Sequence, residues 1–208
     1  MIFYAMPGTC ALSVHIALEW IGQPYELKLL AKGENREPAY LKVHPLGKVP
    51  AVRTDEGQVL TEAAAILGWL VDTHPDASIG PAQGTFERAR LTELLAYLTS
   101  EVHVAFGPYF APDRYLAEPA QHEALRATAL TSVARHMAML DQRLVGNTHL
   151  LGQRSAADAY LYVLLRWSEA LPGGVAQFAN LSKFRRRLEQ DSGVRAALKA
   201  EHLSPIDS

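Results

Sequence analysis

The sequence has little cysteine and no excess charge of either sign, and each shortage excludes a class of protein. Its 208 residues include a single cysteine, Cys10. No intrachain disulfide can therefore form, and a structural zinc site built on several cysteines is excluded. The 20 basic and 22 acidic residues give a formal net charge of -2. Such a balance offers no broad basic surface, so we expect no nucleic-acid partner.

Segments that would enter a membrane are missing as well. The longest apolar stretch, residues 63–71, is far shorter than the ~20 residues that span a bilayer. The N-terminal residues lack a basic region, and Pro7 and Gly8 interrupt their apolar run, so we expect no signal peptide. A lone thiol suits a reducing compartment. These features together predict a cytoplasmic protein that binds no membrane.

Two kinds of hydrophobic pattern divide the chain near residue 80. Short apolar runs predict strands at residues 2–4, 25–30, 49–53 and 59–60. Residues 11–21 and 63–71 have the spacing of helices. A strand–helix–strand order predicts a parallel pair, and the acidic-glycine turn at residues 55–57 predicts a hairpin.

Beyond residue 84 the apolar residues recur at helical spacing, as in the stripe along residues 91–109. Ser155 and Asp158 have the spacing of an N-terminal capping box and precede one of these helices. We therefore predict an α/β domain followed by an all-helical domain. The expected limits are residues 1–77 for the first domain, 78–84 for the linker and 85–208 for the second domain.

Cys10 follows a Pro-Gly turn and begins a helix. Unpaired backbone N–H groups at a helix N-terminus favour a thiolate, so this position predicts a lowered pKa. The alternative is a buried, inert thiol. Val49-Pro50 opens a strand, and local sequence favours an ordinary edge proline there over a cis bond.

The junction at residues 61–63 admits two interpretations. Thr61 suits an N-cap, and Glu62 would then only compensate the helix dipole. Glu62 could instead bind the ammonium group of a ligand. His103 interrupts a helical stripe and is compatible with a partly buried histidine. The eight histidines include no H-x-H or H-E-x-x-H arrangement, so we expect no metal site.

Several of these motifs occur in the order typical of one family. They are residues 7–18, 44–50, 60–63, 100–103 and 155–161. In this order the sequence resembles the glutathione transferases, and its details resemble the bacterial beta class. The resemblance implies a thioredoxin-like first domain that binds glutathione as a co-substrate and an all-helical second domain. It also implies a homodimer.

The resemblance assigns roles to individual residues. Cys10 would lie beside the glutathione sulfur, and His103 would approach from the second domain as the other catalytic residue. The residues implied in glutathione binding are Lys32, Val49, Pro50, Glu62 and Ala63, with a cis bond between Val49 and Pro50. An apolar pocket for the acceptor substrate is expected from Phe106, Tyr109, Phe110, Tyr162, Arg166 and Trp167, although each aromatic residue could equally belong to the core.

The implied reaction is transfer of the glutathione thiol to a small hydrophobic electrophile, as in detoxification. The alternatives are a glutathione-dependent thiol–disulfide oxidoreductase, dehalogenase or peroxidase, or a non-catalytic binding protein. Three positions depart from the family pattern. Ala96 replaces a frequent asparagine, Ala63 replaces a frequent serine, and Tyr4 lies one residue farther from Pro7 than expected. We expect these changes to weaken glutathione affinity and Tyr4 to point differently.

Overall fold

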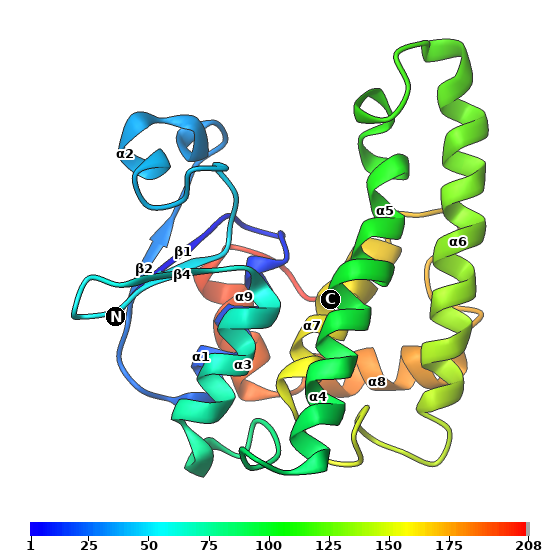
Figure 1. Ribbon diagram of the computed structural model, residues 1–208. Helices are drawn as coiled ribbons and strands as arrows, with labels where there is room; N and C mark the ends of the chain where they lie inside the picture. Colours follow the sequence, from blue (N-terminus) through cyan, green and yellow to red (C-terminus); the bar gives the residue numbers. More distant parts are fainter. Residues whose placement is uncertain (207–208) are drawn as a thin grey trace.

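A four-stranded sheet with its helices forms the first part of the chain, and helices alone form the second part (Figure 1). This computed structural model describes residues 1–206, so the last two residues of the predicted helical domain lie outside it. The first part contains β1 (Ile2–Ala5), α1 (Ala11–Ile21), β2 (Glu26–Leu29), α2 (Pro38–Leu41), β3 (Ala51–Arg53), β4 (Val59–Thr61) and α3 (Ala63–Thr73). The second contains α4 (Phe86–Tyr97), α5 (His103–Phe110), α6 (His122–Arg143), α7 (Ala156–Ser168), α8 (Ala179–Glu189) and α9 (Ser192–Ala200). This order confirms the predicted fold class.

The sheet has the strand order β2-β1-β3-β4, in which β1 and β2 are parallel and the other pairs antiparallel. Side chains alternate across β1 because successive residues of a strand point to opposite faces. Phe3 and Ala5 are fully buried in the main core. Tyr4 instead packs against Tyr40 in a second, small cluster, with 5.6 Å between ring centroids. Tyr4 therefore lies on the face of the sheet that points away from the main core.

Local signals in the sequence set several helix ends. Gly22 ends α1 in the left-handed conformation, with φ 71°, as its place after the apolar stripe predicts. The capping box before α7 is confirmed. An Asp158 oxygen accepts a hydrogen bond from the Ser155 N–H at 2.7 Å, and the other accepts from the Leu150 N–H at 2.9 Å. Asp158 is fully buried, so this carboxylate fixes the start of a central helix.

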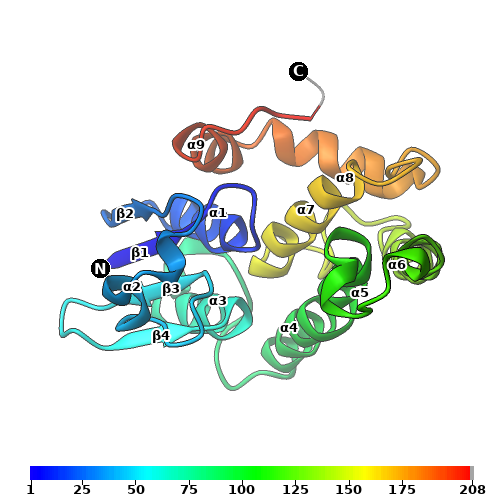
Figure 2. The same ribbon diagram turned by 90° about the horizontal axis from the view of Figure 1, so that it is seen from above.

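Helix α1 lies between the two parts of the molecule and packs against α7 and α9 as well as α3 (Figure 2). Residues 11–18 of α1 are all buried, which explains why this helix is apolar on nearly every side. Helix α9 belongs to the second part, yet it lies beside α1 of the first part (Figure 2). The N-terminus of α1 is consequently held by elements from both parts of the chain.

Two local expectations are wrong. The stripe along residues 91–109 is interrupted by a π-helical turn, Leu98–Val102, so that α5 begins at His103. The N-cap of α3 is Glu62 and not Thr61, which is the last residue of β4. Glu62 has φ 67°, a conformation that costs a residue with a β-carbon about 1–3 kcal/mol and that occurs preferentially at functional sites.

Candidate active site

Cys10 lies at the N-cap position of α1, directly after the turn that contains Gly8. Its thiol donates a hydrogen bond to the carbonyl oxygen of Val49, with 3.6 Å between sulfur and oxygen. The Val49-Pro50 peptide bond is cis, as the family resemblance implies and local sequence alone does not. The structure therefore brings together Cys10 and the Val49-Pro50 segment, which lie far apart in the sequence.

The expectation that the helix N-terminus lowers the pKa of Cys10 is wrong. Burial raises the pKa of the thiol to about 11, and the Glu62 carboxylate adds to this increase. The backbone amide of Cys10, Lys48 and the Tyr160 hydroxyl lower the pKa, but they do not compensate for the lost hydration. The side chain is half-buried and protonated at neutral pH, so a thiolate has to be generated during a reaction.

His103 approaches this thiol from the first residue of α5, and Tyr160 of α7 connects the two. The Tyr160 hydroxyl lies 2.7 Å from Nδ1 of His103 and also interacts with the Cys10 side chain. Burial, followed by the charge of Lys48, lowers the pKa of His103, so its imidazole is neutral at pH 7. The three side chains form a connected set of hydrogen-bonding groups between the two parts of the chain.

Sequence reasoning missed two residues of this site, Tyr160 and Lys48. Tyr160 lies in the motif at residues 155–161. The sequence does not show that its hydroxyl contacts His103, because that contact depends on how the helices pack. Lys48 directly precedes Val49, and its charge lowers the pKa of both Cys10 and His103. The sequence signal for Lys48 was its position directly before Val49-Pro50, the pair that opens a predicted strand.

Two long-range contacts hold the turn before Cys10. The Trp167 indole donates a hydrogen bond from Nε1 to the Gly8 carbonyl oxygen at 2.9 Å. The Gly8 N–H donates to Glu201, whose other carboxylate oxygen lies 2.9 Å from Nδ1 of His15. Both His15 and Glu201 are buried, with at most 1% of their surface exposed. These hydrogen bonds join the turn to α7 and to the residue that follows α9.

The other predicted glutathione-binding residues surround this region with different exposure. Glu62 and Lys32 are exposed, and Ala63, the first residue of α3, is buried. Glu62 affects the pKa of both Cys10 and His103, which places its carboxylate within electrostatic range of them. Lys32 lies in the turn just after β2. Ala96 is exposed on α4 and lines a groove between α3 and α4.

Four of the six residues predicted for the acceptor pocket form an aromatic cluster. Phe106 contacts both Phe110 and Trp167, with ring centroids 6.1 and 5.7 Å away, and Tyr109 packs against Phe110. His103 meets the Trp167 ring edge-on at 4.7 Å, which joins the cluster to the catalytic candidates. Phe106 is almost fully buried, so it forms the base of the cluster, whereas Phe110 is 49% exposed.

The structure does not bring Tyr162 and Arg166 into that cluster. Tyr162 is fully buried, and its hydroxyl donates to Glu189 of α8 at 3.3 Å. Arg166 donates to the Tyr162 hydroxyl and to the carbonyl oxygen of Ser204. Residues 160 and 162 are two positions apart on α7, so their side chains leave the helix in different directions. Tyr162 and Arg166 therefore join α7 to α8 and the C-terminal segment.

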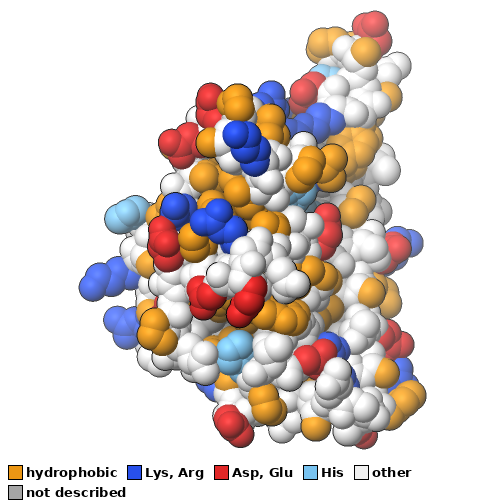
Figure 3. Space-filling view, turned by 60° about the vertical axis from the view of Figure 1, so that its left-hand side comes forward, with side chains coloured by type: hydrophobic (Ala, Val, Ile, Leu, Met, Phe, Trp, Pro, Cys, Tyr) orange, Lys and Arg blue, Asp and Glu red, His pale blue; other side chains and the backbone are white. Residues whose placement is uncertain are grey.

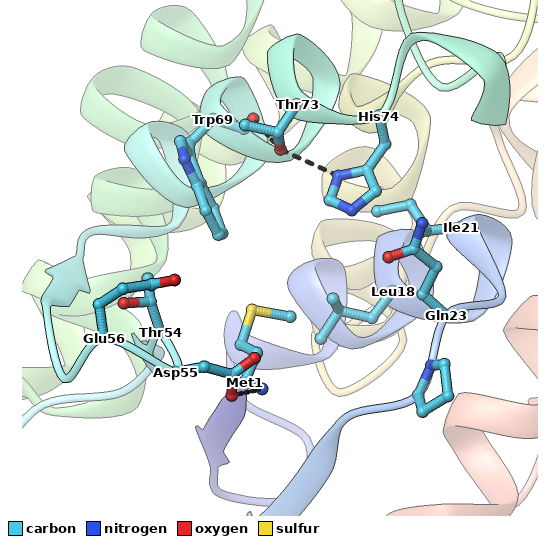
Figure 4. A pocket seen from close by; sticks show the side chains of 11 residues that line it. Met1, Leu18, Ile21, Gln23, Thr54, Asp55, Glu56, Trp69, Thr73 and His74 are labelled. Atoms are coloured by element: carbon cyan, nitrogen blue, oxygen red, sulfur yellow. Dashed lines mark hydrogen bonds and ion pairs between the residues drawn. The ribbon is translucent and has the colours of Figure 1, made fainter.

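Another cavity lies in the first part of the chain, away from all the predicted site residues (Figure 4). It has a volume of about 280 Å³, and its lining includes Met1, Leu18, Asp55, Trp69 and His74. The amino group of Met1 pairs with Asp55 at its edge. This cavity contains neither a cysteine nor the Val49-Pro50 segment, so it does not compete with Cys10 as the candidate site.

Basic and acidic side chains are interspersed with hydrophobic ones on the face that Figure 3 shows. Within residues 1–206, no helix combines the length and the apolar character needed to cross a membrane. Within the same residues, no group of three or more histidine, cysteine or acidic side chains could hold a metal ion.

Known proteins match the chain over nearly its whole length. Residues 8–73 match the family model of the glutathione S-transferase N-terminal domain, and residues 97–191 match that of the C-terminal domain. A glutathione S-transferase of Xanthomonas campestris pv. campestris is 34% identical over 98% of this chain and 100% of its own.

Solved structures of similar proteins share the fold of this chain. A beta-class glutathione S-transferase of Sphingomonas chungbukensis is 36% identical, with a TM-score of 0.89 over 98% of this chain and all of that one. A sphingomonad glutathione S-transferase complexed with glutathione is 38% identical, with a TM-score of 0.88 over the same shares. With Cys10, the cis Val49-Pro50 bond and His103 gathered where its two domains meet, the chain belongs to the glutathione S-transferase family.

Proposed function

We propose that this glutathione transferase conjugates glutathione to small hydrophobic electrophiles, as a cytoplasmic detoxification enzyme. The observation that carries the proposal is the position of Cys10 at the N-terminus of α1, next to the Val49 carbonyl and within the reach of His103 through Tyr160. In conjugation with an aryl halide, the S–H bond of glutathione and the carbon–halogen bond break while the sulfur bonds to that carbon, and the proton and the halide are released. The backbone amide of Cys10, which lowers the pKa of a sulfur at this position, and the dipole of α1 would stabilise the negative charge on that sulfur.

Glutathione would be bound by groups suited to each part of the tripeptide. Val49 offers its backbone to the cysteinyl part, and Glu62 with the Ala63 N–H suits the ammonium and carboxylate of the γ-glutamyl end. Lys32 would attract the glycyl carboxylate. The acceptor would lie against Phe110, the most exposed member of the aromatic cluster, and against Tyr109 beside it.

Binding and catalysis can be tested separately. We expect the protein to be retained on immobilised glutathione and to be eluted by free glutathione. We also expect turnover of chlorodinitrobenzene, a general electrophile, with Glu62→Ala raising KM for glutathione. The proposal fails if the protein is not retained and gives no conjugate, an outcome that would favour a non-catalytic binding protein.

A second candidate activity, glutathione-dependent thiol–disulfide exchange, is favoured by the hydrogen-bonded set of Cys10, Tyr160 and His103. A thiol with a base in reach can attack the disulfide bond of a glutathionylated substrate, so that the substrate leaves as a thiol and Cys10 keeps the glutathionyl group in a mixed disulfide. Cys10 is the single cysteine of the chain, so a second glutathione would have to resolve that disulfide. We expect Cys10→Ala to abolish exchange and to reduce conjugation far less, since the backbone amide of residue 10 and the dipole of α1 still act on the glutathione sulfur. Equal loss of both activities would exclude this division of roles.

The partner of the chain would be a second copy of itself. The groove between α3 and α4 that Ala96 lines has a volume of about 520 Å³, and apolar side chains such as Leu60, Trp69 and Leu95 contribute to it. Apolar surface of this kind suits a homodimer contact. Light scattering coupled to size exclusion should give twice the chain mass, and Ala65→Arg, at an exposed position that lines the groove, should give the chain mass. A monomeric wild-type protein would contradict the dimer.

A further inference from the structure

Gly107 of α5 lets the side chain of Tyr115 approach the helix directly. A β-carbon at position 107 would lie 2.2 Å from the Tyr115 hydroxyl oxygen and 3.1 Å from the ring carbon that bears it, far inside van der Waals contact. Glycine leaves that space empty because it has no side chain. The Tyr115 hydroxyl therefore lies over Gly107, although Tyr115 belongs to the segment between α5 and α6.

Gly107 shares one face of α5 with two candidate site residues. It follows His103 by four positions and precedes Phe110 by three, and residues at these spacings are neighbours on a helix surface. The rise of a helix places Gly107 about 6 Å along α5 from His103. The Tyr115 hydroxyl consequently lies between the imidazole of His103 and the exposed ring of Phe110.

The turn that carries Tyr115 is held by its own backbone and by α6. The Tyr115 N–H donates to the Pro112 carbonyl oxygen at 2.9 Å, and the Leu116 N–H donates to the same oxygen at 3.0 Å. Nε2 of His122, the first residue of α6, lies 2.9 Å from the Leu116 carbonyl oxygen. These contacts fix the backbone from which the Tyr115 side chain reaches α5.

The Tyr115 hydroxyl has no hydrogen-bond partner within residues 1–206, and the side chain is 50% exposed. By contrast, the hydroxyls of Tyr25, Tyr40, Tyr97 and Tyr162 each contact a polar group of the protein. A tyrosine hydroxyl can donate one hydrogen bond. In a substrate cleft such a donor acts most strongly on an oxygen that becomes negative during the reaction.

We propose that the Tyr115 hydroxyl donates a hydrogen bond to the acceptor substrate and so favours α,β-unsaturated ketones that carry an apolar group on the carbonyl carbon. The inference rests on the conjugation proposed above and names its class of electrophile. The apolar group would lie against Phe110, and the carbonyl oxygen would meet the hydroxyl over Gly107. The far carbon of the double bond would then point toward Cys10, beside which the glutathione sulfur is expected.

The addition conserves atoms and electrons. The S–H proton of glutathione leaves to solvent, and the sulfur bonds to the far carbon of the double bond. The electron pair of the double bond moves toward the carbonyl group, whose oxygen becomes an enolate oxygen and accepts the hydrogen bond from Tyr115. A proton from solvent then adds to the carbon next to the carbonyl group. No group leaves, and no oxidant or reductant is consumed.

Tyr115→Phe tests the hydrogen bond, because it keeps the ring and removes the hydroxyl. The full-length protein and glutathione are assayed with phenyl propenyl ketone and with benzyl chloride, an electrophile without oxygen, and each rate is corrected for the uncatalysed reaction. The ratio of the kcat/KM for the ketone to that for the chloride should fall about tenfold. Most of the loss should be in kcat for the ketone, since the hydrogen bond is strongest to the enolate.

Gly107→Ala tests the same hydrogen bond without removing the hydroxyl. Its β-carbon would take the space of the Tyr115 oxygen, so the tyrosine has to move away and the ratio should again fall about tenfold. The double variant should show no larger fall than either single one, because both changes remove one interaction. Tyr97→Phe is the matched control. The Tyr97 hydroxyl lies 2.8 Å from Nδ1 of His136, between α4 and α6, and its loss should leave the ratio unchanged.

Each outcome decides between the proposals. If the wild-type protein conjugates neither electrophile, the proposed conjugation fails and the role of Tyr115 fails with it. If wild type conjugates benzyl chloride but not the ketone, the role of Tyr115 alone is overturned. The same holds if Tyr115→Phe leaves the ratio unchanged, or lowers both kcat/KM values equally as a packing defect would. Should Tyr115→Phe not fold, Gly107→Ala decides, and an unchanged ratio there overturns the role as well.

Discussion

The Trp167 indole N–H and the Gly8 carbonyl oxygen form a 2.9 Å hydrogen bond that joins the helical part of the chain to the turn before Cys10. Residues on α7 thereby determine where the N-terminus of α1 lies. The same helix carries Tyr160 on the side of Cys10 and Tyr162 in the contact with α8. A change in α7 is therefore expected to affect the site without touching any residue that binds glutathione.

Trp167→Phe should separate this anchoring from simple packing. The variant keeps an aromatic ring and loses one hydrogen bond, so we expect about 1 kcal/mol less stability and a several-fold weaker affinity for glutathione. Trp20→Phe is the matched control, because the Trp20 indole donates to Asp191 at 2.7 Å, at another place on α1. Urea unfolding and calorimetric titration with glutathione measure both effects. An equal loss of affinity in the two variants would contradict the prediction.

The thiol of Cys10 should titrate far above the usual range for cysteine. Burial raises its pKa to about 11, so thiolate should accumulate only as the pH rises toward that value. The ultraviolet absorbance of the thiolate, taken as the difference between wild type and Cys10→Ser, should stay flat through neutral pH. An increase centred below about pH 8 would show that the helix N-terminus dominates over burial.

At position 62 the wild-type glutamate should favour glutathione binding while lowering the free energy of unfolding. Its φ of 67° favours glycine, so Glu62→Gly should raise the free energy of unfolding by about 1 kcal/mol relative to Glu62→Ala. Both variants lose the carboxylate, and both should bind glutathione more weakly than wild type. Chemical unfolding and glutathione titration check the two effects, and a Glu62→Gly protein less stable than Glu62→Ala would refute the strain.

Loss of the buried carboxylate of Glu201 should be costly. Its oxygens meet Nδ1 of His15 at 2.9 Å and the Gly8 N–H at 3.2 Å. Glu201→Ala leaves the buried imidazole of His15 and the half-buried Gly8 N–H without this partner, so we expect a loss of about 1–3 kcal/mol. Glu93→Ala, which removes an exposed pair with Arg90, should cost about 0.3 kcal/mol. Thermal unfolding of the two variants side by side measures the contrast.

The parts of the fold that follow from local chemistry were predictable. Gly22 ends α1 because glycine adopts the left-handed conformation readily, and Asp158 starts α7 because a capping box needs only residues three apart. The parallel pair of β1 and β2 follows from the helix that connects them. Each of these features depends on neighbours in the sequence.

The features that escaped prediction depend on distant contacts. The π-helical turn at residues 98–102 leaves no periodic signal, and the conformation of Glu62 is imposed by the way β4 meets α3. The pKa of Cys10 depends on how much of the thiol the second domain covers, and a helix N-terminus in the sequence says nothing of that. The sequence did not single out Tyr160, because the partner of its hydroxyl lies 57 positions away.

The hydrogen bond from Gly8 to Glu201 spans 193 positions of the chain. When the ribosome has completed α1, most of the chain, including Glu201, has still to be synthesised. The Gly8 N–H in the turn before Cys10 can therefore form this hydrogen bond only after α9 and Glu201 have been synthesised. The reactive thiol is among the first residues synthesised, yet its surroundings are among the last to be completed.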